Sequence, residues 1–183
     1  DCVASLGEVL RRKGDNDGAE ESYRRALAGR EKIDGPMNRG TLDCVHNLGD
    51  LLSDKGDSEG AEKLYRRALE GREKTLGPNH PSTLHSVNNL GYLLRDKGDL
   101  EGAEELYRKA AEQGDADAQR ELGVMYALGK GVTQDEVEAL KWFRKAVEQG
   151  DAISQDNLAL MYMNGEGVTQ DFSEAEKLFR KAA

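Results

Sequence analysis

Hydrophobic residues recur along the chain at the spacing of amphipathic helices. Val45, Leu48 and Leu52 lie at positions i, i+3 and i+7, which places them in one apolar stripe on a helix. A second stripe follows within Ala61–Ala68. No segment alternates apolar and polar residues with the two-residue period of a half-buried strand. The pattern therefore predicts an all-α fold built from pairs of helices.

Glycine and aspartate separate the two helices of a pair. Gly56 follows Lys55 at the expected end of the first helix, where glycine accepts a left-handed backbone and a basic side chain suits the helix dipole. Asp57 comes next and can accept hydrogen bonds from the free N–H groups that begin the second helix. In that second helix, Glu62 precedes Arg66 by four residues, an order that supports a helix.

The whole helix pair repeats, first every 42 residues and then every 36 residues. The longer period relates Leu6-Gly7 to Leu48-Gly49 and Leu90-Gly91, and Lys13-Gly14-Asp15 to Lys55-Gly56-Asp57 and Lys97-Gly98-Asp99. The shorter period relates Leu122-Gly123 to Leu158-Ala159, and Gly131-Val132-Thr133-Gln134-Asp135 to Gly167-Val168-Thr169-Gln170-Asp171.

We therefore expect five helix-turn-helix units. Three occupy residues 1–40, 41–82 and 83–114, and two occupy residues 115–150 and 151–183. A helix pair this short cannot bury its apolar face alone, so neighbouring units must stack. The sequence predicts one continuous solenoid.

Small residues recur inside the predicted helices. Gly49 and Gly91 lie within a first helix, where glycine costs roughly 1 kcal/mol relative to alanine. Repetition of this cost at one position predicts that a neighbouring helix passes too close to admit a Cβ. Ala61 and Ala68 would supply small surfaces on the partner helix.

The repeated positions resemble two known repeat families. The series Leu48-Gly49, Leu52, Ala61, Tyr65 and Ala68 resembles the tetratricopeptide signature, and Gly77-Pro78-Asn79-His80-Pro81 with Asn88-Asn89-Leu90 resembles the 42-residue variant of kinesin light chains. In the last two units, Tyr126, Gly129, Gly131-Val132, Asp135, Ala139, Trp142, Phe143, Lys145-Ala146 and Gly150 resemble Sel1-like repeats. The first resemblance covers residues 1–114 and the second covers residues 115–183. Together they imply a right-handed α-solenoid whose first helices line a concave surface.

The resemblance to kinesin light chains implies a binding role for asparagines on this concave surface. Asn47 and Asn89 match the asparagine position that bonds a peptide backbone, and Asn88 is its neighbour. A side-chain amide offers both a donor and an acceptor, which suits an extended peptide of any sequence. The same face is expected to carry His46, Asp50, Ser53, His85, Tyr92 and Arg95.

The alternative for all these residues is a solvated helix face without a ligand. The first unit departs from this pattern, with Ala4 and Ser5 in place of the asparagine. If Asn47 and Asn89 bind a partner, replacing both with alanine should weaken binding and leave the melting temperature nearly unchanged.

Other polar and sulfur-containing residues have simpler interpretations. Gln119 and Asn157 begin first helices of the Sel1-like units and are expected on the solvated surface. Cys2 and Cys44 are one repeat apart, and helices packed at about 8–10 Å exceed the ~7 Å limit for a disulfide. Both cysteines are predicted to be small packing residues. His80 fits the turn motif, without the neighbours that a metal site needs.

The remaining motifs also favour structural roles. Gly129-Lys130-Gly131 lacks the preceding strand and the following Lys-Ser/Thr of a phosphate-binding loop, so its glycines are assigned to a turn. Trp142, Phe143 and Phe179 follow helical spacing and are predicted to pack within or between units.

Charge and composition narrow the class of function. The formal net charge is -9, which argues against nucleic acid or an anionic membrane as the partner. No apolar run approaches the ~20 residues of a membrane-spanning helix. Two cysteines in 183 residues argue against a disulfide-stapled secreted scaffold. We expect a soluble, cytoplasmic protein, and one that is part of a longer chain.

The sequence contains no catalytic constellation and no set of metal or cofactor ligands, so we expect neither enzymatic activity nor a cofactor. The predicted function is a scaffold or adaptor that binds a protein or peptide on the concave face. The alternative is a regulatory or oligomerisation arm of a larger signalling or enzyme protein. The array is expected to be monomeric, with uncapped ends that permit self-association.

Overall fold

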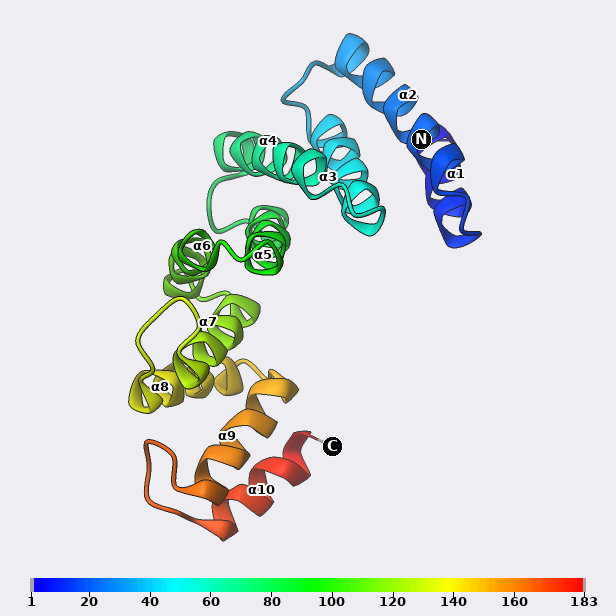
Figure 1. Ribbon diagram of the computed structural model, residues 1–183. Helices are drawn as coiled ribbons and strands as arrows, with labels where there is room; N and C mark the ends of the chain where they lie inside the picture. The colour runs from blue at the N-terminus through cyan, green and yellow to red at the C-terminus, as the bar shows by residue number, and fades with distance from the viewer. Residues whose placement is uncertain (1, 183) are drawn as a thin grey trace. The chain divides into compact units, whose positions relative to one another are not determined.

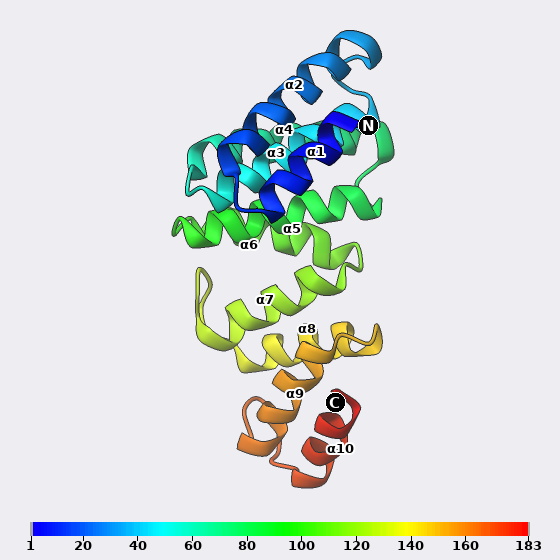
Figure 2. The same ribbon diagram turned by 90° about the vertical axis from the view of Figure 1, so that its right-hand side faces the viewer.

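The computed structural model describes the backbone of residues 2–182 and the side chains of residues 4–182. This part of the chain contains ten α-helices and no strand, and consecutive helices are joined by turns or short loops (Figures 1 and 2). The helices are α1 (Cys2–Arg12), α2 (Asn16–Asp34), α3 (Arg39–Asp54), α4 (Ser58–Leu76), α5 (Pro81–Asp96), α6 (Leu100–Glu112), α7 (Ala116–Leu128), α8 (Glu136–Glu148), α9 (Ala152–Asn164) and α10 (Phe172–Ala182). The predicted all-α repeat fold is confirmed.

The chain divides into two compact units, unit 1 (Asp1–Lys97) and unit 2 (Gly98–Ala183). The division falls within the third repeat, so α5 belongs to unit 1 and α6 to unit 2. The change of repeat period lies further along, near residue 115. The continuous solenoid stays a prediction.

Each second helix in the 42-residue class begins at the aspartate of the Lys-Gly-Asp motif. The Asp57 carboxylate accepts a hydrogen bond from the Gly60 backbone N–H at 2.9 Å, and Asp15 and Asp99 cap α2 and α6 in the same way. Gly56 precedes the cap with a φ of 81°, a left-handed conformation that favours glycine. Local chemistry therefore places the predicted helix boundaries.

The glycine inside each first helix makes room for an aromatic ring of the second helix. A Cβ added at Gly49 would lie 2.9 Å from Cε1 of Tyr65, and a Cβ at Gly7 would lie 2.9 Å from Cε1 of Tyr23. Phe143 takes the place of the tyrosine against Gly123, at 2.7 Å. The predicted close approach is confirmed, and the group that requires it is an aromatic ring.

Successive repeats of unit 1 are joined by apolar and charged contacts. Leu48 and Leu51 of α3 pack against Ala19 and Tyr23 of α2 in one buried cluster. Lys55, just after α3, places its Nζ 2.7 Å from carboxylate oxygens of Asp17 and Glu20 on α2. Lys97 makes the corresponding contact with Glu62, 42 residues later.

Cys44 is buried in α3, consistent with a small packing residue, and burial raises the pKa of its thiol. The Cys2 side chain lies outside the described residues. His80 is the N-cap of α5, where its Nδ1 accepts a hydrogen bond from the Ser82 N–H at 3.1 Å.

Gln119 departs from the sequence-based expectation of a solvated surface residue. Its side chain is buried, with Nε2 donating to the Ala111 carbonyl at 3.1 Å and Oε1 accepting from Gln149 at 2.8 Å. The expectation was wrong because the amide satisfies buried polar groups where helices meet. Asn157 is half-buried on α9.

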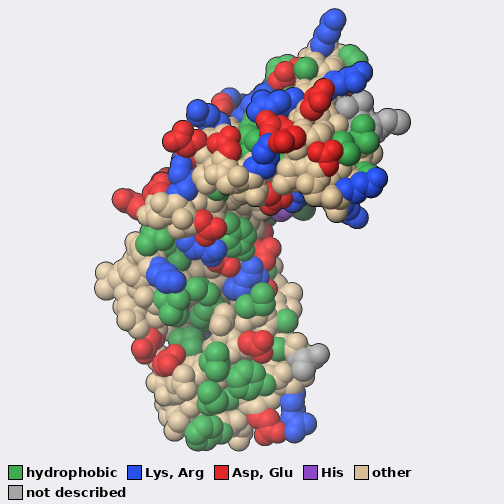
Figure 3. All heavy atoms as spheres, turned by 45° about the vertical axis from the view of Figure 1, so that its right-hand side comes forward, with side chains coloured by type: hydrophobic (Ala, Val, Ile, Leu, Met, Phe, Trp, Pro, Cys, Tyr) green, Lys and Arg blue, Asp and Glu red, His purple; other side chains and the backbone are tan. Residues whose placement is uncertain are grey.

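The aromatic residues of unit 2 contribute unequally to its core. Trp142 and Phe143 are buried, as predicted, and Phe143 packs in a cluster with Ala139, Leu158 and Ala159. Phe179 is 36% exposed and fits the predicted packing role only in part. In Figure 3, hydrophobic side chains reach the surface over the C-terminal part of the chain.

Gly129 and Gly131 both have positive φ, in the turn between α7 and α8, as the turn assignment predicts. No helix within residues 2–182 is both long enough and apolar enough to span a bilayer.

Candidate functional site: the first-helix face of unit 1

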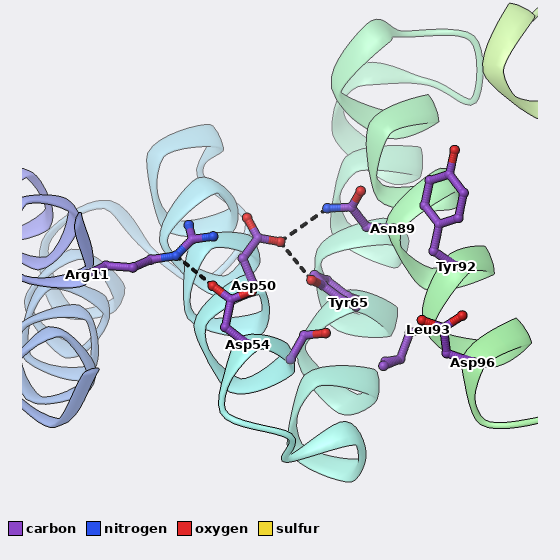
Figure 4. A pocket seen from close by; sticks show the side chains of 9 residues that line it. Arg11, Asp50, Asp54, Tyr65, Asn89, Tyr92, Leu93 and Asp96 are labelled. Carbon is purple, nitrogen blue, oxygen red and sulfur yellow. Dashed lines mark hydrogen bonds and ion pairs between the residues drawn. The ribbon is translucent and has the colours of Figure 1, made fainter. Parts of the chain in front are cut away.

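The nine predicted binding residues all belong to α3 and α5, the first helices of the second and third repeats. With α1, these helices form what we call the first-helix face of unit 1. A cavity of about 320 Å³ opens on this face (Figure 4). Its lining comes from α1, α3, α4 and α5 and comprises Arg11, Asp50, Ser53, Asp54, Tyr65, Asn89, Tyr92, Leu93 and Asp96. Four of the predicted residues therefore share one cavity: Asp50, Ser53, Asn89 and Tyr92.

Asp50 lies in the wall of this cavity and is held by two donors. The Tyr65 hydroxyl donates to Asp50 Oδ1 at 2.7 Å, and the Asn89 amide donates to the same oxygen at 3.1 Å (Figure 4). Tyr65 comes from α4 of the same repeat, and Asn89 comes from the next repeat. Burial raises the pKa of Tyr65 well above its usual value, with a further contribution from the Asp50 charge. The hydroxyl therefore stays protonated and keeps Asp50 in place.

Asn89 presents only part of its amide to the cavity. Its Nδ2 lies 3.1 Å from Asp50 Oδ1 and 3.2 Å from His46 Nε2, so both amide hydrogens have acceptors within the protein. The opposite amide orientation would bring two oxygens together beside Asp50. Figure 4 shows the Asn89 oxygen directed away from Asp50. The sequence suggested a donor and an acceptor for a ligand, and the structure leaves the acceptor.

His46 lies behind the face and is only 2% exposed. Its ring centroid is 5.3 Å from that of Tyr65 and 4.7 Å from that of His85. Burial lowers the pKa of His46 to about 4, so the imidazole is neutral at pH 7. The buried Nδ1 has no hydrogen-bond partner among the described residues.

His46 and Asn88 cannot contact a ligand directly in this conformation. Asn88 is 6% exposed, and the sequence alone placed both side chains on the binding face. The rings of Tyr65, from the same repeat, and His85, from the following repeat, lie against His46, and Asn88 is buried. Neighbouring His85 is exposed on α5.

Asn47 borders a second hollow on the first-helix face. This hollow has a volume of about 630 Å³ and is otherwise lined by residues of α1, namely Ala4, Ser5, Glu8, Val9 and Arg12. Asn47 is half-buried, and its amide makes no hydrogen bond to the described residues. Unlike Asn89, whose Nδ2 contacts Asp50 and His46, it has a donor and an acceptor that none of the described residues uses.

Tyr92 and Arg95 lie together on α5, both half-buried. The guanidinium carbon of Arg95 is 5.1 Å from the centre of the Tyr92 ring, within the range of a cation–π contact. Arg95 Nη2 is also 3.4 Å from Oδ1 of the adjacent Asp96. The face thus already brings one guanidinium of the chain itself against an aromatic ring.

Several lining residues were not predicted from the sequence, most notably Arg11, Asp54 and Asp96. Arg11 Nε donates to Asp54 Oδ2 at 2.8 Å and so joins the first repeat to the second. A usable signal was present, because Asp54 lies four residues after Asp50 and therefore on the same helix face.

The titratable side chains of the face are not arranged as a metal site. Among residues 2–182, no group of three or more histidine, cysteine, aspartate and glutamate side chains could hold a metal ion.

Family models match the whole described chain. Residues 2–74 and 42–116 match the tetratricopeptide repeat, and residues 116–151 and 152–183 match the Sel1 repeat. The split agrees with the change of period in the sequence. A search of curated proteins found no match.

Solved structures include relatives of both repeat classes. A Sel1 repeat protein from Oxalobacter formigenes is 26% identical, with a TM-score of 0.70 over 98% of this chain and 68% of that chain. The protective antigen c5321 from uropathogenic Escherichia coli is 29% identical, with a TM-score of 0.69 over 98% of this chain and 37% of that chain.

A putative kinesin light chain from Podosopora anserina, with nearly identical TPR-like repeats, has a TM-score of 0.72. It is 21% identical over 99% of this chain and 92% of that chain. At this identity the likeness extends to the fold alone.

Proposed function

Because this chain belongs to the tetratricopeptide repeat family, we propose that it binds an extended segment of another protein along the first-helix face of unit 1. Tetratricopeptide and Sel1 repeat proteins are generally scaffolds for protein–protein interaction and are typically non-catalytic. For this chain we specify the binding face, an extended peptide as the ligand, and the residues that contact it.

The cavity of about 320 Å³ on this face is the observation that carries the proposal. Its wall is built before any ligand arrives, since Tyr65 and Asn89 hold Asp50 at 2.7 and 3.1 Å. A preformed wall reduces the conformational entropy lost on binding, so even shallow contacts contribute to affinity.

The dimensions of the face suit a short extended segment. Neighbouring helices pack at about 8–10 Å, so a ligand crossing α1, α3 and α5 spans about 20 Å. An extended chain covers this distance with about six residues. Asn47 would bond the ligand backbone through its side-chain amide, and Asn89 would accept a bond from a backbone N–H through its oxygen.

A peptide-array screen with the purified chain tests the proposal. Peptides retained on the array are then measured against Asn47→Ala, which removes a half-buried amide without a hydrogen-bond partner among the described residues. We expect weaker binding with unchanged helicity. Arg24→Ala, an exposed change on α2, is the matched control and should leave affinity unchanged.

The proposal is refuted if the retained peptides bind Asn47→Ala as tightly as the parent chain and no longer bind Arg24→Ala. That result would place the ligand on the second helices. A chain that binds only to itself would instead favour the oligomerisation arm.

A further inference from the structure

We propose that the cavity between α3 and α5 accepts an arginine or lysine side chain of the bound segment. This inference rests on the proposed function and specifies the chemistry of its ligand. It derives from a comparison of two successive steps along the first-helix face, the first from helix α1 to helix α3 and the second from helix α3 to helix α5.

In the first step, from α1 to α3, the chain itself supplies the basic group. Arg11 extends from α1 and donates from Nε to Oδ2 of Asp54 at 2.8 Å. This ion pair shows that a guanidinium fits between first helices of adjacent repeats, against the carboxylate at this position.

In the second step, from α3 to α5, the basic group is missing. The 42-residue period relates Arg11 to Ser53 and Asp54 to Asp96, so a serine stands where the arginine would extend. Ser53 and Asp96 both line the cavity. The short serine side chain leaves space in front of Asp96 that the longer arginine fills one repeat earlier.

Asp96 remains accessible to a ligand. Its side chain is 71% exposed, and the adjacent Arg95 approaches it with Nη2 at 3.4 Å from Oδ1. A second cation can therefore reach the carboxylate from the cavity side. A guanidinium would also find the Asn89 oxygen as an acceptor.

The balance of charge in the cavity favours a cation. Three carboxylates line it, from Asp50, Asp54 and Asp96, and two guanidinium groups approach them, from Arg11 and Arg95. Arg11 pairs with Asp54 and Arg95 lies beside Asp96, so three negative charges face two positive ones and the cavity keeps a net negative charge. An acidic ligand side chain would be repelled here, whereas a basic one would balance the remaining negative charge.

Pools of ten-residue peptides can test this preference directly. Each pool carries Arg, Lys, Gln or Glu at the fifth position and a mixture of residues elsewhere, with a fluorescent label for polarisation measurements. We expect the Arg and Lys pools to bind about fivefold more tightly than the Gln pool, as one partly exposed ion pair allows. The Glu pool should bind most weakly, and added salt should reduce the differences.

Two variants should remove the preference in different ways. Asp96→Asn removes the carboxylate, and Ser53→Arg supplies an internal guanidinium to pair with Asp96, as Arg11 pairs with Asp54. Both should lower binding of the Arg pool to the level of the Gln pool. Glu21→Gln removes one exposed negative charge from α2 and serves as the control for net charge. Circular dichroism verifies that each variant keeps its helicity.

The outcomes separate this inference from the proposed function. If the Gln or Glu pool binds as well as the Arg pool and Asn47→Ala weakens that binding, the basic preference is overturned and the peptide-binding face stands. An Arg preference unchanged by Asp96→Asn in a folded variant also overturns it. If no pool and no array peptide binds, both proposals fail.

Discussion

The packing of Tyr65 against Gly49 leads to a quantitative prediction for Gly49→Ala. The added Cβ would lie 2.9 Å from Cε1 and 3.0 Å from Cδ1 of the ring, closer than real Cβ atoms approach their neighbours. The ring cannot simply move away, because its hydroxyl donates to Asp50 at 2.7 Å. The substitution should therefore be felt both in the core and at the candidate site.

The magnitude follows from two opposing contributions. Alanine in a helix interior is favoured over glycine by roughly 1 kcal/mol, while overpacking a core costs about 1–3 kcal/mol. We expect a net loss of about 1 kcal/mol from the free energy of unfolding. Gly29→Ala is the matched control, since Gly29 lies within α2 and a Cβ there meets nothing within 4 Å. This control should gain up to about 1 kcal/mol.

Urea unfolding followed by circular dichroism measures both variants against the parent chain. The expected difference between Gly49→Ala and Gly29→Ala is about 2 kcal/mol. If Gly49→Ala stabilises the chain as much as Gly29→Ala does, the close approach of the ring does not explain the glycine, and the reasoning is refuted.

Three further predictions concern the groups around Asp50. Asn89→Ala should lower the free energy of unfolding by about 1–2 kcal/mol, because it removes donors from Asp50 and His46. Asn47→Ala should change the same free energy by less than about 0.5 kcal/mol. Equal melting temperatures for the two variants would contradict this difference. Tyr65→Phe should cost about 1 kcal/mol in urea unfolding and weaken peptide binding by releasing Asp50, and unchanged affinity would show that the position of Asp50 is not needed. His46 has a pKa of about 4 in the folded chain, below the ordinary 6.5, so its protonation favours the unfolded state. The stability contributed by neutral His46 should be full above pH 6.5 and fall by up to about 3 kcal/mol as the pH drops towards 4. This fall should be smaller in His46→Asn.

The first of these predictions revises the expectation drawn from sequence. The sequence treated Asn47 and Asn89 as equivalent ligands whose loss would leave melting nearly unchanged. In the structure, the Asn89 amide bridges two repeats, whereas the Asn47 amide has no hydrogen-bond partner among the described residues. Their different neighbours give them different expected effects.

Helices, turns and the repeat pattern were readable from the sequence because their causes are local. Asp57 caps the helix that it immediately precedes, and Gly56 adopts a left-handed conformation beside it. The apolar period and its recurrence after 42 residues then predict paired helices that must stack. The same logic found the face that carries Asp50 and Asn89.

Tertiary packing alone decided which polar side chains on that face remain available. His46 and Asn47 are adjacent in sequence, yet one is buried behind aromatic rings and the other borders a hollow. The bonds that fix Asp50 join residues 15 and 39 positions apart, and their partners depend on how closely the helices pack. Helical periodicity determines the direction in which a side chain leaves the axis of its helix. The neighbour that the side chain contacts in that direction belongs to another helix, so only the tertiary structure identifies it.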